Sequence, residues 1–369
     1  MFGTVPAHGE VCAPGKSGMS AAARRKRLAI VGAGPSGLAA AWRLRDVPEI
    51  DVTVFEKSNG VFGRAATRIR HGVRLDPGAN YFRTDLPEIA SMVHSQLQSD
   101  DLIEIAGAID VFDRFGMIAA GDASLNAQEK WTYGHGISSL GTLLAEAAGC
   151  NIVFDTKVGR IKRDSRSRMW EVFDEELASR GVFDVMLLAL PAPQAIALLP
   201  DDAAVAISAL TPASYHAQWS FTFGFDSDVY RWPGQSYALI NADRQHPIAW
   251  TSRENAKPGR IPDQTLAIML QMQPAWSVER FDRDAGQLAP EVASLLAELL
   301  GWHKVMFRWF DAKRWKYSLP SGRADLKQLR LVEADGLYVA GDAVVGKGRV
   351  ALALQSGLDA AARIVDSGL

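Results

Sequence analysis

The sequence has little cysteine and no excess of charge of either sign. Only Cys12 and Cys150 occur in 369 residues, and no C-x-x-C pair is present. This excludes a disulfide framework, a cysteine metal site and a redox dithiol, so we expect a reducing, cytoplasmic setting. The 40 basic and 42 acidic side chains give a net charge of −2. No overall field therefore favours nucleic acid or an anionic membrane surface as a partner.

Long apolar runs are also missing. No stretch approaches the roughly 18 apolar residues of a membrane-spanning helix. The apolar run after Arg24–Arg27 is too short for a secretion signal. Residues 1–25 have no apolar periodicity, and we expect a disordered leader there, with Met19 as an ordinary start. The rest of the chain is long enough for two domains.

What the sequence does contain is one glycine turn after a strand. The apolar run Leu28–Val31 suits a buried parallel strand, and Gly32, Gly34 and Gly37 follow it in the spacing G-x-G-x-x-G. The first glycine permits the tight turn, the second lets a pyrophosphate approach the backbone, and the third lets helix and strand pack closely. The pattern predicts a dinucleotide site with its phosphates at a helix N-terminus.

The elements expected after this turn are also present. Leu38–Arg45 is alanine-rich and reads as a helix, and Val52–Phe55 reads as the next strand. Glu56 ends that strand about 20 residues after the turn, where a carboxylate accepts hydrogen bonds from an adenosine ribose. Strand, turn, helix and acid together support dinucleotide binding far better than the glycines alone.

A second loop is suited to the same pyrophosphate. Gly60 and Gly63 offer backbone amides, and Arg64 offers a planar guanidinium, which suits a doubly charged phosphate pair. The string Leu75–Asn80, of the form D-x-G-A, then suits a close approach of the backbone to a flat group.

This order of motifs resembles the FAD signature of the glutathione-reductase-type fold in its flavin amine oxidase branch. One departure is Phe62-Gly63, where that family usually has paired glycines before the arginine. The resemblance implies a Rossmann-like FAD domain and a second, α+β substrate domain. With no cysteine near the expected flavin, it also implies that FAD is bound non-covalently.

The stretch after the FAD motifs is less informative. We expect a helix at Leu86–Leu97, short strands within Ile103–Ile118, a loop at Trp131–Gly136 and a helix at Ile137–Ala148. His135 in that loop could face the flavin or be an ordinary loop histidine at the domain edge.

The FAD domain is expected to resume at Asn151–Lys162. There Val158 resembles the edge-strand valine whose backbone pairs with adenine. Phe183–Pro191 reads as a buried strand ended by proline.

At the C-terminus, the strand within Gly336–Ala343 runs into Gly341-Asp342, and the family resemblance gives Asp342 a hydrogen bond to the ribityl chain. A basic turn with Lys347 and Arg349 precedes a helix at Val350–Ile364. The dipole of that helix would stabilise negative charge at the flavin N1–C2=O edge.

The second domain holds most of the tryptophans. We expect strands at Ala217–Phe225, Tyr237–Asn241 and Thr265–Gln273 and a helix at Pro290–Leu300, which fits a mainly antiparallel sheet packed by helices. We assign residues 26–82, 140–195 and 330–369 to the FAD domain, and 83–139 and 196–329 to the substrate domain.

Three strings in this half resemble the renalase-like flavoproteins: Trp250–Arg260, Pro274–Ser277 and Arg314–Pro320. Gln271 lies where we expect many of those relatives to have a histidine, which would alter the substrate if that histidine shapes the pocket. Any one of the tryptophans is more often a core residue than a pocket residue.

The resemblance yields two sets of site residues. The substrate-pocket candidates are His135, Trp250, Trp315, Tyr317 and Gln271. The FAD candidates are Gly32, Gly34, Pro35, Ser36, Gly37, Glu56, Lys57, Gly63, Arg64, Gly78, Ala79, Asn80, Tyr81, Val158, Pro191, Gly341, Asp342, Arg349 and Val350.

The predicted reaction is hydride transfer from a C–H next to nitrogen to flavin N5, with reoxidation by dioxygen to hydrogen peroxide. By resemblance the leading substrate is a dihydronicotinamide isomer of NAD(P)H. An amine oxidase acting on a small amine, a flavin-dependent desaturase or isomerase, and a non-catalytic flavoprotein remain open. We nominate no general base and no metal, and we expect a monomer or homodimer.

Overall fold

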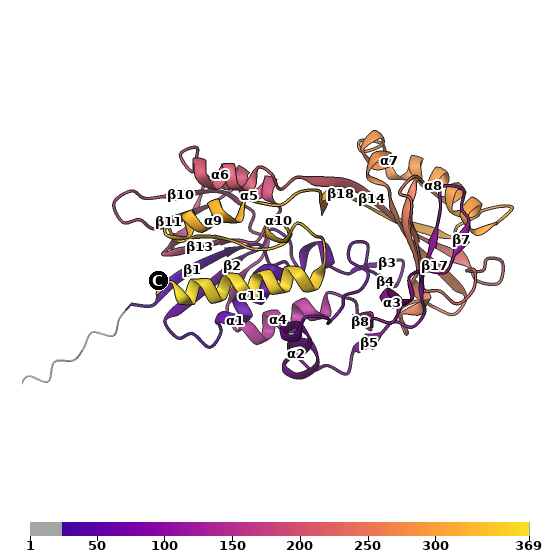
Figure 1. Cartoon of the computed structure of the whole chain (residues 1–369), viewed down its shortest axis with the longest axis horizontal. Coiled ribbons are helices and arrows are strands. Elements are labelled where there is room, and N and C mark those ends of the chain that lie inside the picture. Colours follow the sequence, from indigo (N-terminus) through magenta and orange to yellow (C-terminus); the bar gives the residue numbers. More distant parts are fainter. Residues whose placement is uncertain (1–23, 369) are drawn as a thin grey trace, which may run out of the picture.

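The protein, described by a computed structural model over residues 24–368, has two lobes side by side. The predicted leader lies outside the described residues except for its last two. Two long strands run between the lobes, β14 (Tyr215–Asp226) and β18 (Trp309–Pro320) (Figure 1). Within the described part of the chain, no helix is both long and apolar enough to cross a membrane.

The first lobe is built on a five-stranded parallel sheet with the order β19-β13-β1-β2-β9. Leu28 and Ile30 of β1 point to one face, and Ala29 and Val31 point to the other, as the two-residue period of a strand requires. All four side chains are buried, which explains the short apolar runs in the sequence. The strands are β1 (Lys26–Val31), β2 (Ile50–Phe55), β9 (Asn151–Val153), β13 (Val185–Leu188) and β19 (Leu337–Val339).

Each face of this sheet has its own cover. The helices α1, α4 and α11 pack on the face of Leu28, with α11 lying along the sheet in Figure 1. A three-stranded antiparallel sheet and the helices α5, α6 and α9 cover the other face. The bounds are α1 (Pro35–Leu44), α4 (Ser139–Ala148), α11 (Val350–Asp366), β10 (Val158–Arg163), β11 (Trp170–Asp174), β12 (Ser179–Phe183), α5 (Ala192–Leu198), α6 (Ala204–Leu210) and α9 (Leu326–Glu333).

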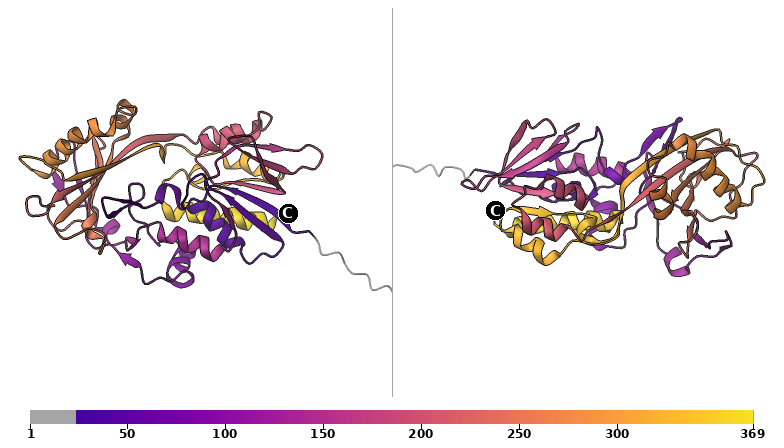
Figure 2. Two further views of the ribbon diagram at one scale, coloured as in Figure 1. Left: turned by 180° about the vertical axis from the view of Figure 1, so that it is seen from behind. Right: turned by 90° about the horizontal axis from the view of Figure 1, so that it is seen from above.

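The second lobe is a seven-stranded sheet with the order β18-β14-β17-β16-β15-β6-β7, in which only β15 and β6 pair in parallel. This confirms the mainly antiparallel sheet expected from the sequence. Phe221, Phe223 and Phe225 are fully buried on β14 under the two helices α7 and α8, which cover one face (Figure 2). The bounds are β6 (Ile109–Phe112), β7 (Ile118–Ala119), β15 (Ala238–Asn241), β16 (Ile248–Arg253), β17 (Thr265–Met272), α7 (Pro274–Glu279) and α8 (Ala285–Leu300).

Two sequence-based expectations differ from the structure. Trp131–Tyr133 is strand β8, not loop, because it pairs with β5 and Trp131 bridges to Phe82. Helix α8 begins at Ala285, since Asp284 caps it through the amides of Gly286 and Gln287, and Pro290 lies inside the helix.

The domain limits at residues 83, 139 and 196 stay a prediction, and the elements next to them pack as parts of both lobes. The helices α5 and α6 bury Ala195 and Leu210 with the first sheet. The helical stretch after residue 86 likewise joins the first lobe, whereas β6 and β7 join the second. The remaining elements are η1 (Gly63–Ala65), β3 (Arg68–Arg70), β4 (Val73–Leu75), α2 (Pro87–Ser91), π-helical η2 (Met92–Gln96), β5 (Leu102–Glu104), α3 (Ala123–Asn126), β8 (Trp131–Tyr133), η3 (Glu254–Ala256) and α10 (Asp342–Val345).

The unusual Phe62 is accommodated by a neighbouring glycine. Phe62 has φ of 77°, a left-handed conformation that bulky residues rarely adopt, and its side chain is fully buried. A Cβ on Gly141 of α4 would lie 2.6 Å from the Phe62 ring, so only glycine fits there. The ring therefore occupies space that any other residue at 141 would fill.

We predict that Gly141→Ala lowers the free energy of unfolding by about 1–3 kcal/mol, because the new methyl overpacks the Phe62 ring. Helix propensity alone predicts the opposite sign, a gain near 1 kcal/mol. Urea unfolding of Gly141→Ala, Phe62→Gly and the double variant measures the interaction free energy between the two positions. If Gly141→Ala costs the same in both backgrounds, the ring contact is not its cause.

Candidate functional site

The glycine turn has the shape that a pyrophosphate requires. Gly32 has φ of 105°, and a Cβ there would lie 2.8 Å from the Ala189 carbonyl oxygen. A Cβ on Gly37 would lie 2.0 Å from the Gly32 oxygen, so helix and turn touch at this point. At Gly34, by contrast, no atom lies within 4 Å of a Cβ, and the backbone faces open space. The turn thus fits the dinucleotide that the spacing predicts.

Glu56 lies directly beside this turn. Its carboxylate is buried and accepts hydrogen bonds of 2.9 Å from the amides of Ala33 and Ser58. Two amides leave acceptor capacity on both oxygens, which a ribose diol can use. The backbone of Thr156 donates to the Glu56 carbonyl, which brings the segment leading to Val158 to the same end of the site. Lys57 is exposed.

Arg64 and Asp342, which the sequence assigned to different parts of FAD, are bound to each other. The Arg64 guanidinium forms two parallel hydrogen bonds to the carboxylate, at 2.6 and 2.9 Å, and also donates to the carbonyls of Tyr317 and Ser318 on β18. Tyr215 donates its hydroxyl to Asp342 at 2.8 Å. Burial lowers the pKa of Arg64, but the hydrogen bonds and charge of Asp342 outweigh it and raise the pKa above its usual value.

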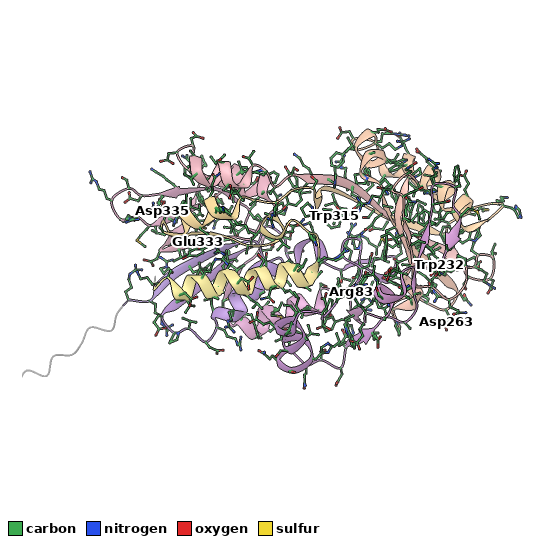
Figure 3. All side chains as sticks on the ribbon, in the orientation of Figure 1. Arg83, Trp232, Asp263, Trp315, Glu333 and Asp335 are labelled. Carbon is green, nitrogen blue, oxygen red and sulfur yellow. The ribbon has the colours of Figure 1, made fainter. Side chains whose placement is uncertain are left out.

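A second group gathers around the backbone of Gly78. Gln271 donates its side-chain amide to the Gly78 carbonyl at 2.6 Å. A Cβ on Gly78 would lie 3.3 Å from Cζ2 of Trp315, whose indole N–H donates to Ser220 at 3.1 Å. Trp315 lies where β18 passes between the lobes (Figure 3). The pocket candidates Gln271 and Trp315 therefore meet the D-x-G-A loop.

Tyr81, the residue after this loop, lies near two other aromatic rings. Trp250 is 6.2 Å from Tyr81 and 6.2 Å from Tyr237, measured between ring centroids, and Tyr81 and Tyr237 are 6.3 Å apart. The Tyr237 hydroxyl and the Trp250 indole nitrogen are buried and have no hydrogen-bond partner among the described residues. These are the kind of groups that a bound molecule or water satisfies in a binding site.

Asp76 of this loop belongs to a cluster of four ionisable side chains, which we call the buried ion cluster: Asp76, Glu254, Lys257 and Arg260. Lys257 lies 2.8 Å from Glu254 and 3.3 Å from Asp76, and Arg260 also binds Asp76. All four side chains are buried. Burial raises the pKa of Asp76, but the charges of Lys257 and Arg260 outweigh it and hold the pKa below its usual value.

The remaining candidates are not brought into this group. The ring of His135 is 71% exposed and binds Asp101 at 2.7 Å, as expected of a loop histidine. Lys347 and Arg349 are exposed before α11, which begins at the buried Val350. Pro191 precedes α5. Tyr215, Ser220 and Tyr237 were missed because a tyrosine or serine in a strand carries no local signal of its partners.

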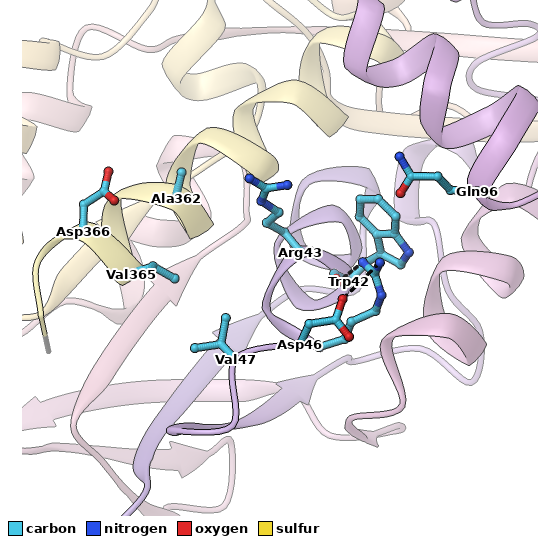
Figure 4. A pocket seen from close by; sticks show the side chains of 9 residues that line it. Trp42, Arg43, Asp46, Val47, Gln96, Ala362, Val365 and Asp366 are labelled. Carbon is cyan, nitrogen blue, oxygen red and sulfur yellow. Dashed lines mark hydrogen bonds and ion pairs between the residues drawn. The ribbon is translucent and has the colours of Figure 1, made fainter.

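One cavity in the first lobe is not part of the candidate site. It has a volume of about 340 Å³ and is lined by Trp42, Arg45, Asp46 and Val365, at the C-terminal ends of α1 and α11 (Figure 4). The glycine turn lies at the other end of α1. The cavity is therefore separate from the dinucleotide site.

Asp76→Asn is expected to lower the free energy of unfolding by about 3–5 kcal/mol, because Lys257 and Arg260 would share a single buried carboxylate. Glu175→Gln is the matched control, since it breaks the Lys157–Glu175 pair, in which both side chains are more than half exposed. That change should cost less than about 1 kcal/mol. Equal midpoints of chemical unfolding for the two variants would contradict this account of the cluster.

Comparisons with known proteins agree with this geometry. Residues 30–95 match the NAD(P)-binding Rossmann-like domain, and residues 113–365 match the flavin containing amine oxidoreductase model. A curated relative, protoporphyrinogen oxidase 2, chloroplastic/mitochondrial, from Arabidopsis thaliana, is 43% identical over 68 residues, which are 18% of this chain and only 13% of that protein.

Two solved structures share the fold over almost their whole length. One is a candidate protoporphyrinogen oxidase from an Exiguobacterium species, with a TM-score of 0.73, 16% identity, and coverage of 93% of this chain and 98% of the other. The other is cyclohexylamine oxidase from Brevibacterium oxydans, with a TM-score of 0.71, 14% identity, and coverage of 93% and 99%. The amine oxidoreductase model spans more than half of the sequence, so the chain belongs to the flavin-containing amine oxidoreductase family and is an FAD-dependent oxidoreductase.

Proposed function

We propose that this enzyme is a renalase-like oxidase of a planar, nitrogen-containing ring, with a dihydronicotinamide as its leading substrate. The observation that carries the proposal is that two tryptophans of the renalase-like strings meet the D-x-G-A loop. Trp315 lies against Gly78, and Trp250 lies beside Tyr81. Aromatic side chains in these places suit a flat substrate, since each offset-stacked pair contributes about 0.5–1.5 kcal/mol.

The residues near Gly78 suit a reaction that needs no protein base. Gln271 and Trp315 are neutral at every ordinary pH, and both act as hydrogen-bond donors. The nitrogen of a dihydronicotinamide is already neutral, so its lone pair can expel the hydride without loss of a proton. Bound FAD would accept the hydride at N5.

The proposed reaction balances with dioxygen as the electron acceptor. The substrate gives up two electrons and one hydrogen as hydride and becomes a pyridinium cation. Dioxygen takes the two electrons, that hydrogen and one proton from water, and leaves as hydrogen peroxide. The residues around the ring have to orient it and exclude water.

For the cofactor, we propose that the glycine turn binds the pyrophosphate and that Glu56 binds the adenosine ribose. Asp342 would bind the ribityl chain, and Arg64 would hold that carboxylate in position through its two parallel hydrogen bonds. The contact between Arg64 and the pyrophosphate stays a prediction. One edge of the guanidinium already binds Asp342.

An amine oxidase is the second candidate. The family model and the fold of cyclohexylamine oxidase favour it. A small amine differs from a dihydronicotinamide in being cationic at neutral pH, so it must lose a proton before hydride transfer. The two candidates therefore differ in the chemistry that the site must supply.

Glu56→Ala should weaken retention of FAD by about 1–3 kcal/mol, the cost of an unmet hydrogen bond to a charged group. Glu56→Gln keeps an oxygen acceptor and the shape of the side chain, and it should lie between Glu56→Ala and the unchanged protein. The measurement is the FAD dissociation constant after dialysis, from recovery of flavin fluorescence. Three equal dissociation constants would remove Glu56 from the site.

The substrate class is tested by anaerobic mixing. Dihydronicotinamide isomers made by borohydride reduction should bleach the flavin absorbance within seconds, and air should restore the absorbance with formation of peroxide. Ordinary NADH and simple monoamines should react far more slowly. Rapid bleaching by a monoamine and none by any dihydronicotinamide would reject the ring substrate in favour of the amine.

A further inference from the structure

We propose that Arg83 and Lys130 form an anion subsite that binds a carboxylate group of the substrate. The proposal rests on the proposed function, because it takes the rings of Tyr81, Trp250 and Tyr237 as the place where the substrate ring binds, which we call the ring site. It narrows the planar ring of the proposed function to one that carries a carboxylate, either directly or on a short chain.

The two cations face each other across a pair of chain segments near the junction of the lobes (Figure 3). Phe82 and Trp131 form an antiparallel bridge, with backbone hydrogen bonds of 2.9 and 2.8 Å. In such a pair the residue after one partner lies opposite the residue before the other, so Arg83 lies opposite Lys130. Tyr81 is two residues before Arg83 and therefore projects to the same side.

This side of the segments turns toward the ring site. Ile105 donates its backbone N–H to the Lys130 carbonyl at 2.7 Å, so it is the neighbour of Lys130 on the next strand. The Ile105 side chain is buried in one cluster with Tyr237. Tyr81 and Trp250 pack against that cluster. The anion subsite and the ring site thus lie on the same face of these strands.

Neither cation has a carboxylate partner among residues 24–368. Lys130 is only 5% exposed, yet its ammonium forms no ion pair or hydrogen bond within that range. Arg83 donates to the side-chain oxygen of Gln128 and to the Leu125 carbonyl, which are neutral acceptors. Its Nε is buried and has no hydrogen-bond partner there. The protein therefore fixes both cations in place without balancing their charge.

This arrangement is costly unless an anion joins it. Like charges directly opposite each other on neighbouring strands destabilise the pair. Burial and the charge of Arg83 lower the pKa of Lys130, and the charge of Glu104 only partly opposes them. Two cations and one nearby acid leave one positive charge. A carboxylate matches that charge, and its two oxygens can accept from two separate donors.

The test measures binding of three acids and their uncharged amides to the FAD-loaded enzyme by flavin difference spectroscopy. The acids are benzoate, phenylacetate and 3-phenylpropionate, which vary the distance from ring to carboxylate and have no C–H next to nitrogen to oxidise. At least one acid should bind about tenfold more tightly than its amide, because a hydrogen bond between charged groups is stronger than one to a neutral group.

Variants assign that preference to the two cations. Lys130→Gln should remove most of the preference, and Arg83→Gln should reduce it about three- to tenfold. Lys130→Arg keeps the charge and should retain most of the preference. Lys304→Gln, which changes an exposed lysine after α8, is the matched control and should leave the preference unchanged.

A structural lysine, whose stem packs while its ammonium serves no ligand, is the alternative explanation. Lys130→Met distinguishes the two, because methionine keeps an unbranched apolar chain and removes the charge. In the FAD-loaded enzyme without an acid, the midpoint of urea unfolding should stay the same or rise, since a buried and unpaired charge is lost. A clearly lower midpoint would assign Lys130 to the structure and overturn the proposal.

Two binding results would also overturn it. One is an equal affinity for acid and amide in all three pairs, and the other is no binding of any acid. Failure of the proposed function looks different: no dihydronicotinamide bleaches the flavin, whereas the preference for an acid over its amide still decides the role of Arg83 and Lys130.

Discussion

The arrangement of the candidate site depends on the four side chains of the buried ion cluster, which are buried together. Asp76 belongs to the D-x-G-A loop of the first lobe, whereas Glu254, Lys257 and Arg260 follow strand β16 of the second. An unpaired charge is costly in an apolar interior, and Asp76 is the carboxylate that both Lys257 and Arg260 contact. Gly78 belongs to the same loop as Asp76, and Gln271 of β17 and Trp315 of β18 contact it.

A second seam joins the lobes closer to the dinucleotide end. Arg64 binds Asp342 of the first lobe and two carbonyls of β18, so one guanidinium ties the end of the parallel sheet to a strand of the other lobe. Tyr215 at the start of β14 adds a hydrogen bond to the same carboxylate. Together with the buried ion cluster, these contacts join residues that lie far apart in the sequence.

Much of the fold could be predicted because its signals are local. The turn Gly32–Gly37 and the acid Glu56 are set by spacing along the chain, and the buried strands are short apolar runs. The charged partners of Asp342 and Asp76 and the tyrosine bound to Asp342 could not be predicted, since each lies more than one hundred residues away and a strand tyrosine looks the same whether or not it binds a carboxylate. The packing of α5 and α6 after Pro191 could not be predicted for a related reason: a proline marks a turn, but it does not say onto which face the next helix packs.

The contact between Phe62 and Gly141 makes these two positions dependent on each other. A bulky residue at 62 requires a residue without a side chain at 141, whereas a glycine at 62 removes that requirement. A change from one form to the other by single steps passes through either an overfilled or an emptied interior. The interior at this point is thus filled by one ring from the loop, and α4 contributes only backbone there.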